Sequence, residues 1–247
     1  MAHATERLLK HAPITEAIID LKVKARADFS TYLAPLRAAF GESFEHVEEQ
    51  RTMESFFHVI PGAAITQSAV DRGVRGLVFK SSSGKEAIQV SENGFAFSKL
   101  RPYTNWEDVR DSARRFWVTY RSTVEIDTVN RLGVRYINRF PVRRGRIADY
   151  LANPPSVPET VQPQQVVNAL SRLVIHHNES GIIARVISTM DVDESDTWIT
   201  IDTDAFLNKE FHQDSSELWT TLEELRRVKN RIFFGSITEA AAKEFDE

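Results

Sequence analysis

Residues 129–140 read VNRLGVRYINRF, and this stretch alternates between apolar and polar side chains. Alternation with a period of two is typical of a β-strand whose two faces lie in different environments. The predicted apolar face carries Leu132, Val134, Tyr136 and Phe140, and the opposite face carries Arg131, Gly133, Arg135, Ile137 and Arg139. Residues two apart on a strand lie roughly 6–7 Å from each other on one face, so three guanidinium groups are expected to line up. Like charges in a row need acidic cross-strand partners or an anionic ligand.

Two interpretations of this arginine strand stay open. In the first, its arginines and those that follow bind the phosphate groups of a nucleotide or nucleic acid, which the planar guanidinium fork suits. The candidates for this anion site are Arg131, Arg135, Arg139, Arg143 and Arg144. In the second, the arginines form an ion-pair ladder across a sheet, and the candidate partners are Glu16, Asp20, Glu48, Glu54 and Glu86. The ladder is favoured if the strand that carries Glu16 and Asp20 lies beside the arginine strand.

Alternating patterns predict most of the remaining strands. Residues 15–25 read as a half-buried strand, and residues 44–60 as one long or broken strand. Residues 76–100 are predicted to form a three-stranded antiparallel meander, because a Ser-Ser-Gly turn and an Asn-Gly hairpin signal at Asn93 and Gly94 separate three apolar runs. Further strands are expected at residues 166–177, 182–192 and 198–202.

Two amphipathic helices are predicted from capping boxes and apolar stripes. The first has Thr104 as N-cap and Glu107 as its partner, runs to about residue 120, and carries an aromatic stripe that is typical of a core face. The second opens with Asp214 and Glu217, turns Leu218, Leu222, Leu225 and Val228 inward, and ends in a basic turn at residues 226–231 that complements the helix dipole. Shorter helices are expected near residues 31–40 and after Thr238.

The expected fold class is α+β, with antiparallel sheets packed against a few long amphipathic helices in two associated halves. Five of the nine prolines fall within residues 141–165, which are interpreted as a connection. The predicted organisation is an N-terminal half at residues 1–140, this proline-rich connection, and a C-terminal half at residues 166–247.

Composition excludes several classes of site. The chain has 247 residues, a formal net charge of −4 and no cysteine, which rules out disulfides, thiolate nucleophiles and cysteine-ligated metals. The mild net charge argues against a protein that coats nucleic acid, although a local basic patch stays open. The N-terminal residues lack a signal-peptide core, and no apolar run has the length of a membrane span, so a cytoplasmic protein without membrane association is expected.

No motif of enzymatic chemistry is present in the sequence. Phe234-Gly235-Ser236-Ile237 lacks the second glycine of a nucleophile elbow, and no glycine-rich stretch has the spacing of a phosphate-binding loop. The adjacent His176 and His177 point to opposite faces of a strand and cannot easily ligate one metal. We therefore predict no catalytic residue, no metal site and no cofactor.

Five segments carry a family resemblance: HAPITEAIIDLKV, NGFAFSKLRPYTNWE, FWVTY, RLGVRYINRF and KNRIFFGSIT. In this order they resemble a sporadically distributed bacterial family of uncharacterised proteins, and the resemblance spans nearly the whole chain. It implies a cytoplasmic α+β protein with the scattered occurrence of mobile or defence-associated genes, and no catalytic residue to carry over. The resulting hypothesis is a non-enzymatic interaction or regulatory module with a protein partner or a second copy of itself, such as an accessory, antitoxin-like or sensor component of a defence system. The alternatives are a nucleotide- or phosphate-binding protein or enzyme that uses Arg131, Arg135 and Arg139, and a nucleic-acid binder.

Overall fold

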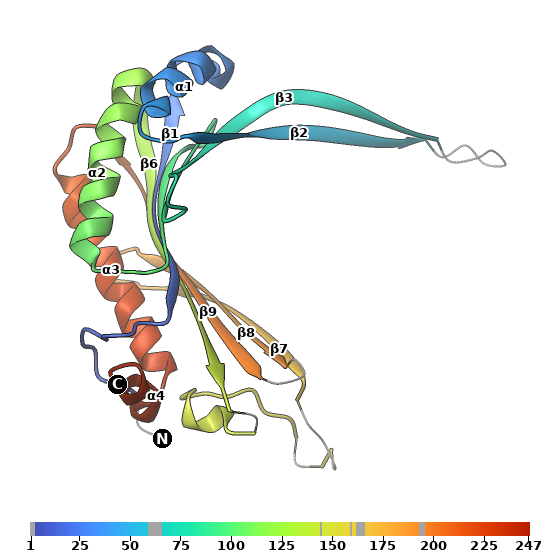
Figure 1. Ribbon diagram of the computed structural model, residues 1–247, viewed down its shortest axis with the longest axis vertical. Helices are drawn as coiled ribbons and strands as arrows, with labels where there is room; N and C mark the ends of the chain where they lie inside the picture. Colours follow the sequence, from blue (N-terminus) through green and yellow to red (C-terminus); the bar gives the residue numbers. More distant parts are fainter. Residues whose placement is uncertain (1–2, 59–65, 144, 159, 162–165, 193–195) are drawn as a thin grey trace.

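One nine-stranded antiparallel sheet organises the computed structural model (Figure 1). The structure describes residues 3–58, 66–143, 145–158, 160–161, 166–192 and 196–247, with the backbone alone at residues 53–58, 66–70 and 72. Its strands are β1 (Ile14–Ala25), β2 (His46–His58), β3 (Thr66–Lys80), β4 (Glu86–Ser91), β5 (Gly94–Leu100), β6 (Ile126–Val142), β7 (Asn168–His176), β8 (Ile183–Val192) and β9 (Thr197–Phe211). They lie in the order β2-β3-β4-β5-β1-β6-β9-β8-β7, so the arginine strand β6 is near the centre and β2 and β7 are the two edges.

Helices cover one face of this sheet and leave the other face open (Figure 1). They are α1 (Leu33–Gly41), α2 (Trp106–Thr123), α3 (Glu217–Ser236) and the short α4 (Glu239–Glu244), with 3-10 turns at Phe29–Tyr32 and Ile147–Asp149. The α2 helix packs on β5 and β1, and α3 packs on β6 and β9. The expected α+β class with antiparallel pairing is thereby confirmed.

The predicted apolar faces form the core. The aromatic stripe of α2 and the inward residues Leu218, Leu222 and Leu225 of α3 are all buried, as is the apolar face of β6. A second cluster joins the end of α3 to α4 around Phe140, Ile199 and Phe233. Apolar periodicity was therefore sufficient to assign the inner face of each of these elements.

The sheet is continuous across the two predicted halves. Strand β6 pairs with β1 from its own half and with β9 from the C-terminal half, so the proline-rich connection joins strands of one sheet rather than two separate sheets. The long hairpin of β2 and β3 reaches away from the body of the molecule (Figure 1). Among the described residues, no helix is both long and apolar enough to cross a membrane.

Predictions about helix ends were wrong in three places. The N-cap of α2 is Asn105 rather than Thr104, because the Asn105 side chain accepts a hydrogen bond from the Asp108 backbone N–H at 2.8 Å. The N-cap of α3 is Ser216, without a side-chain capping bond, rather than Asp214. The α3 helix continues to Ser236, so residues 226–231 occupy its middle and not its last turn.

Candidate functional site

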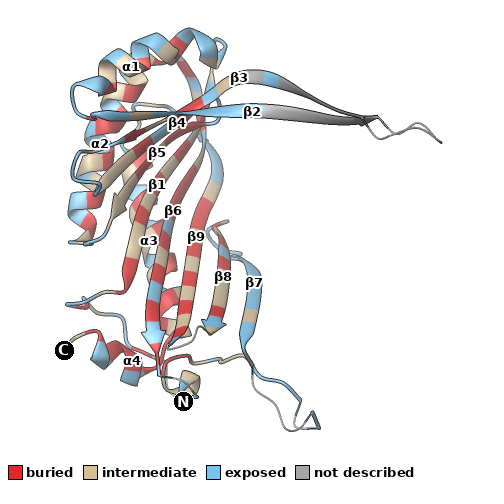
Figure 2. Ribbon diagram, turned by 45° about the vertical axis from the view of Figure 1, so that its right-hand side comes forward, coloured by how far each residue is buried: buried red, intermediate tan, exposed pale blue. Residues whose placement is uncertain are grey.

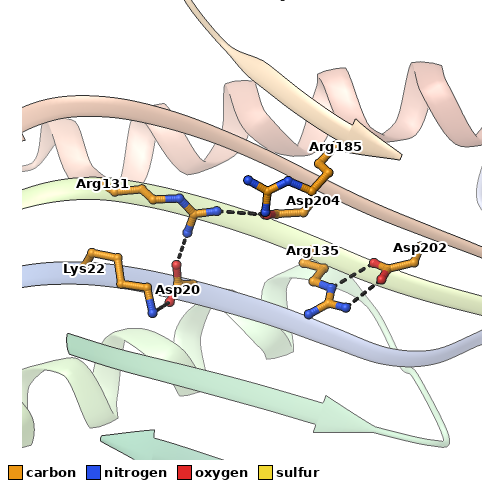
Figure 3. Close-up of polar contacts among 7 residues, drawn as sticks. All are labelled: Asp20, Lys22, Arg131, Arg135, Arg185, Asp202 and Asp204. Carbon is orange, nitrogen blue, oxygen red and sulfur yellow. Dashed lines mark hydrogen bonds and ion pairs between the residues drawn. The ribbon is translucent and has the colours of Figure 1, made fainter. Parts of the chain in front are cut away.

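Arg131 lies on the open face of the sheet between two carboxylates. One amino group of its guanidinium pairs with Asp20 on β1, and the other lies 2.9 Å from Asp204 Oδ2 on β9 (Figure 3). All three side chains are largely buried, at 18%, 15% and 14% exposure respectively. Strand order explains the contact, because β1 and β9 flank β6 on its two sides.

Arg135, four residues further along β6 on the same face, is held by a bidentate ion pair. Its Nε donates to Asp202 Oδ1 at 2.8 Å and its Nη2 donates to Asp202 Oδ2 at 2.6 Å. This hydrogen bonding raises the pKa of Arg135. The fork-to-fork geometry is the strongest arrangement available to an arginine and a carboxylate.

Two further cations complete the network of charges. Lys22 Nζ lies 3.0 Å from Asp20 Oδ1, and Arg185 on β8 lies 3.5 Å from Asp204 Oδ2 (Figure 3). Burial raises the pKa of Asp204, and the field of Arg131 opposes this shift without overcoming it. The four cations of this network, Lys22, Arg131, Arg135 and Arg185, therefore already have carboxylate neighbours, as the ladder interpretation requires.

The other predicted anion-site arginines do not join this network. The Arg139 guanidinium lies over the ring of Trp198, 4.7 Å from its centroid. Arg143 is exposed beyond the end of β6, and Arg144 lies outside the described residues. Of the other acids considered as partners, Glu48 pairs with Lys80 and Glu86 with Lys99, while the Glu54 side chain is not described.

A shallow hollow of about 570 Å³ lies over the charged network and is lined in part by Arg131, Arg135 and Arg185. Binding of a phosphate group there remains a prediction. An anion in this hollow would have to compete with Asp20, Asp202 and Asp204 for guanidinium groups that are already engaged. Within the described part of the chain, no group of three histidine, aspartate or glutamate residues is arranged to hold a metal ion.

The β7 edge, which we define as Asn168–His176, is a feature that sequence patterns did not single out. Its apolar side chains are exposed on both faces: Leu170 at 71%, Leu173 at 55%, Val174 at 64% and Ile175 at 43%. Figure 2 shows this strand as the exposed outer margin of the sheet. On the helix side, the strand borders an apolar groove of about 280 Å³ that α3 does not cover. Its run of apolar residues is equally typical of a buried strand, which is why the sequence alone did not reveal the exposure.

No protein-family model and no curated protein sequence matches the chain. The resemblance to a sporadically distributed bacterial family therefore stays a prediction that rests on the quoted motifs.

Proposed function

We propose that the chain is a non-enzymatic protein-interaction module whose binding element is the β7 edge, and that the β7 strand of a second copy adds to it in antiparallel fashion. The observation that carries this proposal is the row of exposed apolar side chains on an unpaired edge strand. Edge strands of this kind are ready templates for another strand, and strand addition is a recurring mode of recognition. The family resemblance adds the proposed setting, an accessory, antitoxin-like or sensor component of a bacterial defence or mobile-element system.

A comparison of the two sheet edges supports the choice of β7. The opposite edge, β2, presents the exposed charged residues Glu48, Glu49 and Arg51, and charges of this kind discourage pairing with another chain. Strand β7 contains no acidic residue and no proline, and Arg172 is its only lysine or arginine. One edge is therefore protected against strand addition, and the other is open to it.

The backbone of β7 restricts how a second copy can pair. The His177 N–H donates to the Ile182 carbonyl and the Val167 carbonyl accepts from the Val192 N–H, so odd-numbered residues turn their backbone groups toward β8. Consecutive strand residues point these groups to opposite sides, so the even-numbered residues of β7 offer theirs to a new partner. An isologous antiparallel pair must then place even residues opposite even residues.

One register of such a pair avoids opposing positive charges. With Leu173 opposite Leu173 of the second copy, Arg172 lies opposite Val174 and Leu170 lies opposite His176. Shifting the pair one way by two residues sets Arg172 against Arg172, and shifting it the other way sets Arg172 against His176. Like charges directly opposite each other are destabilising, so the Leu173-centred register is favoured.

Sedimentation velocity over a concentration series extending to the millimolar range tests the association. The native chain is expected to form a dimer that Val174→Lys weakens, because the new ammonium would face Arg172 of the second copy. Val118→Lys on α2 is the matched control, because Val118 is also exposed, at 47%, and lies far from β7. A chain that stays monomeric throughout, or a dimer equally insensitive to both variants, would refute the proposal.

A disulfide test examines the register separately. The chain has no cysteine, so Leu173→Cys introduces a single thiol. In the favoured register, the two Cα atoms form a non-hydrogen-bonded pair about 4.5 Å apart, within the range that a disulfide spans. Oxidation is expected to cross-link Leu173→Cys and to leave Leu170→Cys uncross-linked. The reverse result would exclude this register while leaving strand addition to be judged by sedimentation.

A further inference from the structure

Lys229 is a buried cation on the helix side of the sheet. It lies in the middle of α3 and is only 5% exposed. Its ammonium nitrogen lies 3.6 Å from the ring centroid of Tyr136 on β6, which is a cation–π contact. Within the described chain it forms no ion pair and no side-chain hydrogen bond, which is unusual because buried lysines are normally paired.

The surroundings of Lys229 are polar at one point and apolar elsewhere. The hydroxyl groups of Tyr136 and Tyr103 lie 3.1 Å apart and share a hydrogen bond. The buried Asn138 amide donates to the Ile201 carbonyl at 3.3 Å. These groups and Lys229 line a cavity of about 260 Å³, whose remaining walls include Ile14 and Phe233. The cavity is somewhat smaller than those that hold drug-sized ligands.

The charges around the cavity leave the ammonium without a counter-ion. Arg226, one turn earlier on α3, also lines the cavity, and its guanidinium lies 3.8 Å from Glu223 Oε2. The acid that contributes to the field at Lys229 is Glu6, which is exposed and accepts a hydrogen bond from Asn230. Arg7 from the N-terminal segment also lines the cavity, and its guanidinium is paired with Glu239 and Asp246. Among the described cations that line the cavity, Lys229 is therefore the one without an ion-pair partner.

We propose that this cavity binds a small organic carboxylate with a short apolar tail, whose carboxylate pairs with Lys229 and Arg226 while its tail lies against Ile14 and Phe233. The two tyrosine hydroxyl groups and Asn138 are positioned to hydrogen-bond the same carboxylate. This ligand supplies the counter-ion that Lys229 lacks among the described residues. It also fills a largely apolar space in which inorganic phosphate would leave polar oxygens without partners. The β7 edge plays no part in this site.

Burial, reinforced by the field of Arg226, lowers the pKa of Lys229 to about 7 in the free protein. The ammonium form binds the anion, so affinity is expected to be highest below pH 7 and to fall by about tenfold between pH 6 and pH 8. Tyr103 and Tyr136 have pKa values raised by burial and stay neutral over this range. None of the described residues that line the cavity is a histidine, so Lys229 is expected to set this dependence.

Isothermal titration calorimetry on the full chain tests the site, with straight-chain carboxylates from propionate to hexanoate and their primary amides as probes. The carboxylates are expected to bind and the neutral amides to bind far more weakly. Lys229→Met is expected to weaken carboxylate binding by about 10- to 100-fold, the worth of a hydrogen bond to a charged group. Lys243→Met, which removes an exposed lysine of α4, is expected to leave the affinity unchanged.

Four results would overturn the proposal: carboxylates that do not bind, amides that bind as tightly as carboxylates, phosphate that binds as tightly as hexanoate, or Lys229→Met with native affinity. An affinity that does not change between pH 6 and pH 8 would exclude Lys229 as the residue that binds the anion. Met is close to Lys in length and places no charge in the cavity, so the variant is expected to fold.

Discussion

Replacing Lys229 with methionine should stabilise the protein, and the gain should depend on pH. The pKa of Lys229 is lowered from 10.5 to about 7 by burial. Each pKa unit corresponds to about 1.36 kcal/mol, so the buried ammonium costs about 5 kcal/mol of folding free energy at pH 6. Methionine fills a similar volume without this cost.

The sign of the pH dependence follows from proton binding. Between pH 7 and pH 10.5 the unfolded chain keeps the proton on Lys229 and the native state releases it, so native stability rises with pH in this window. The cost of the ammonium is complete below pH 7 and falls to about 2 kcal/mol at pH 9. The advantage of Lys229→Met should therefore shrink by about 2–3 kcal/mol between pH 6 and pH 9.

Urea unfolding followed by tryptophan fluorescence measures this difference, because the chain has four tryptophans and two of them, Trp106 and Trp117, are buried residues of α2. Comparing each variant with the native chain at the same pH cancels the titration of every other group. Lys243→Met serves as the control, and its effect should stay within about 0.5 kcal/mol at each pH. A constant difference between Lys229→Met and the native chain from pH 6 to pH 9 would show that the ammonium is hydrated, and the reasoning would fail.

Two further pairs of variants test the ion pairs of the open face and the close backbone contact at Gly94. Arg131→Met should cost about 3 kcal/mol in urea unfolding, because it removes the partner that Asp20 and Asp204 share and leaves these largely buried carboxylates only the more exposed cations of the network. Lys22→Met, at an ammonium that is 40% exposed, should cost less than about 1 kcal/mol, and equal costs for the two variants would contradict the central place of Arg131 in the network. Gly94 has φ +133°, and a Cβ placed there would lie 2.2 Å from the Leu21 carbonyl oxygen, so Gly94→Ala should cost more than about 3 kcal/mol of folding free energy. Gly84 has φ +66° with open space around it, so Gly84→Ala should cost about 1 kcal/mol. Similar thermal midpoints for the two glycine variants would refute the close contact at Gly94.

Local sequence patterns predicted part of each strand and the inner faces of the helices because each face repeats over several turns or residues. The strand expected at residues 198–202 was too short, since β9 continues to Phe211, and the first half of β3 was not predicted. The strand predicted at residues 15–25 corresponds to β1, and the three-stranded meander corresponds to the end of β3 with β4 and β5. Helix caps depend on a single hydrogen bond, and the neighbouring Thr104 and Asn105 offer similar oxygens, so the sequence could not identify which one caps α2. The pairing of Arg131 with Asp204 was missed because it depends on β9 lying beside β6, a long-range choice of strand order.

The burial of Lys229 could have been predicted from its position in the helical pattern. It lies four residues after Leu225 and seven after Leu222, which places it on the buried stripe of α3. The basic cluster at residues 226–231 instead suggested a helix end, because cations there complement the dipole. Because four of these six residues are lysine or arginine, the sequence did not show that one of them, Lys229, points into the core.

The two faces of β6 differ in how they compensate buried charge. On the open face, Arg131 is 18% exposed and two carboxylates accompany it. On the helix face, Lys229 is more deeply buried, yet the acid that contributes to the field at its ammonium is the exposed Glu6. A residue with only a packing role at this position would be most stable as an apolar side chain, since an unpaired ammonium costs several kcal/mol. A bound carboxylate would recover much of that cost by raising the pKa of Lys229. A bound anion is therefore expected to stabilise the fold more at the unpaired Lys229 than at the arginines that already have carboxylate partners.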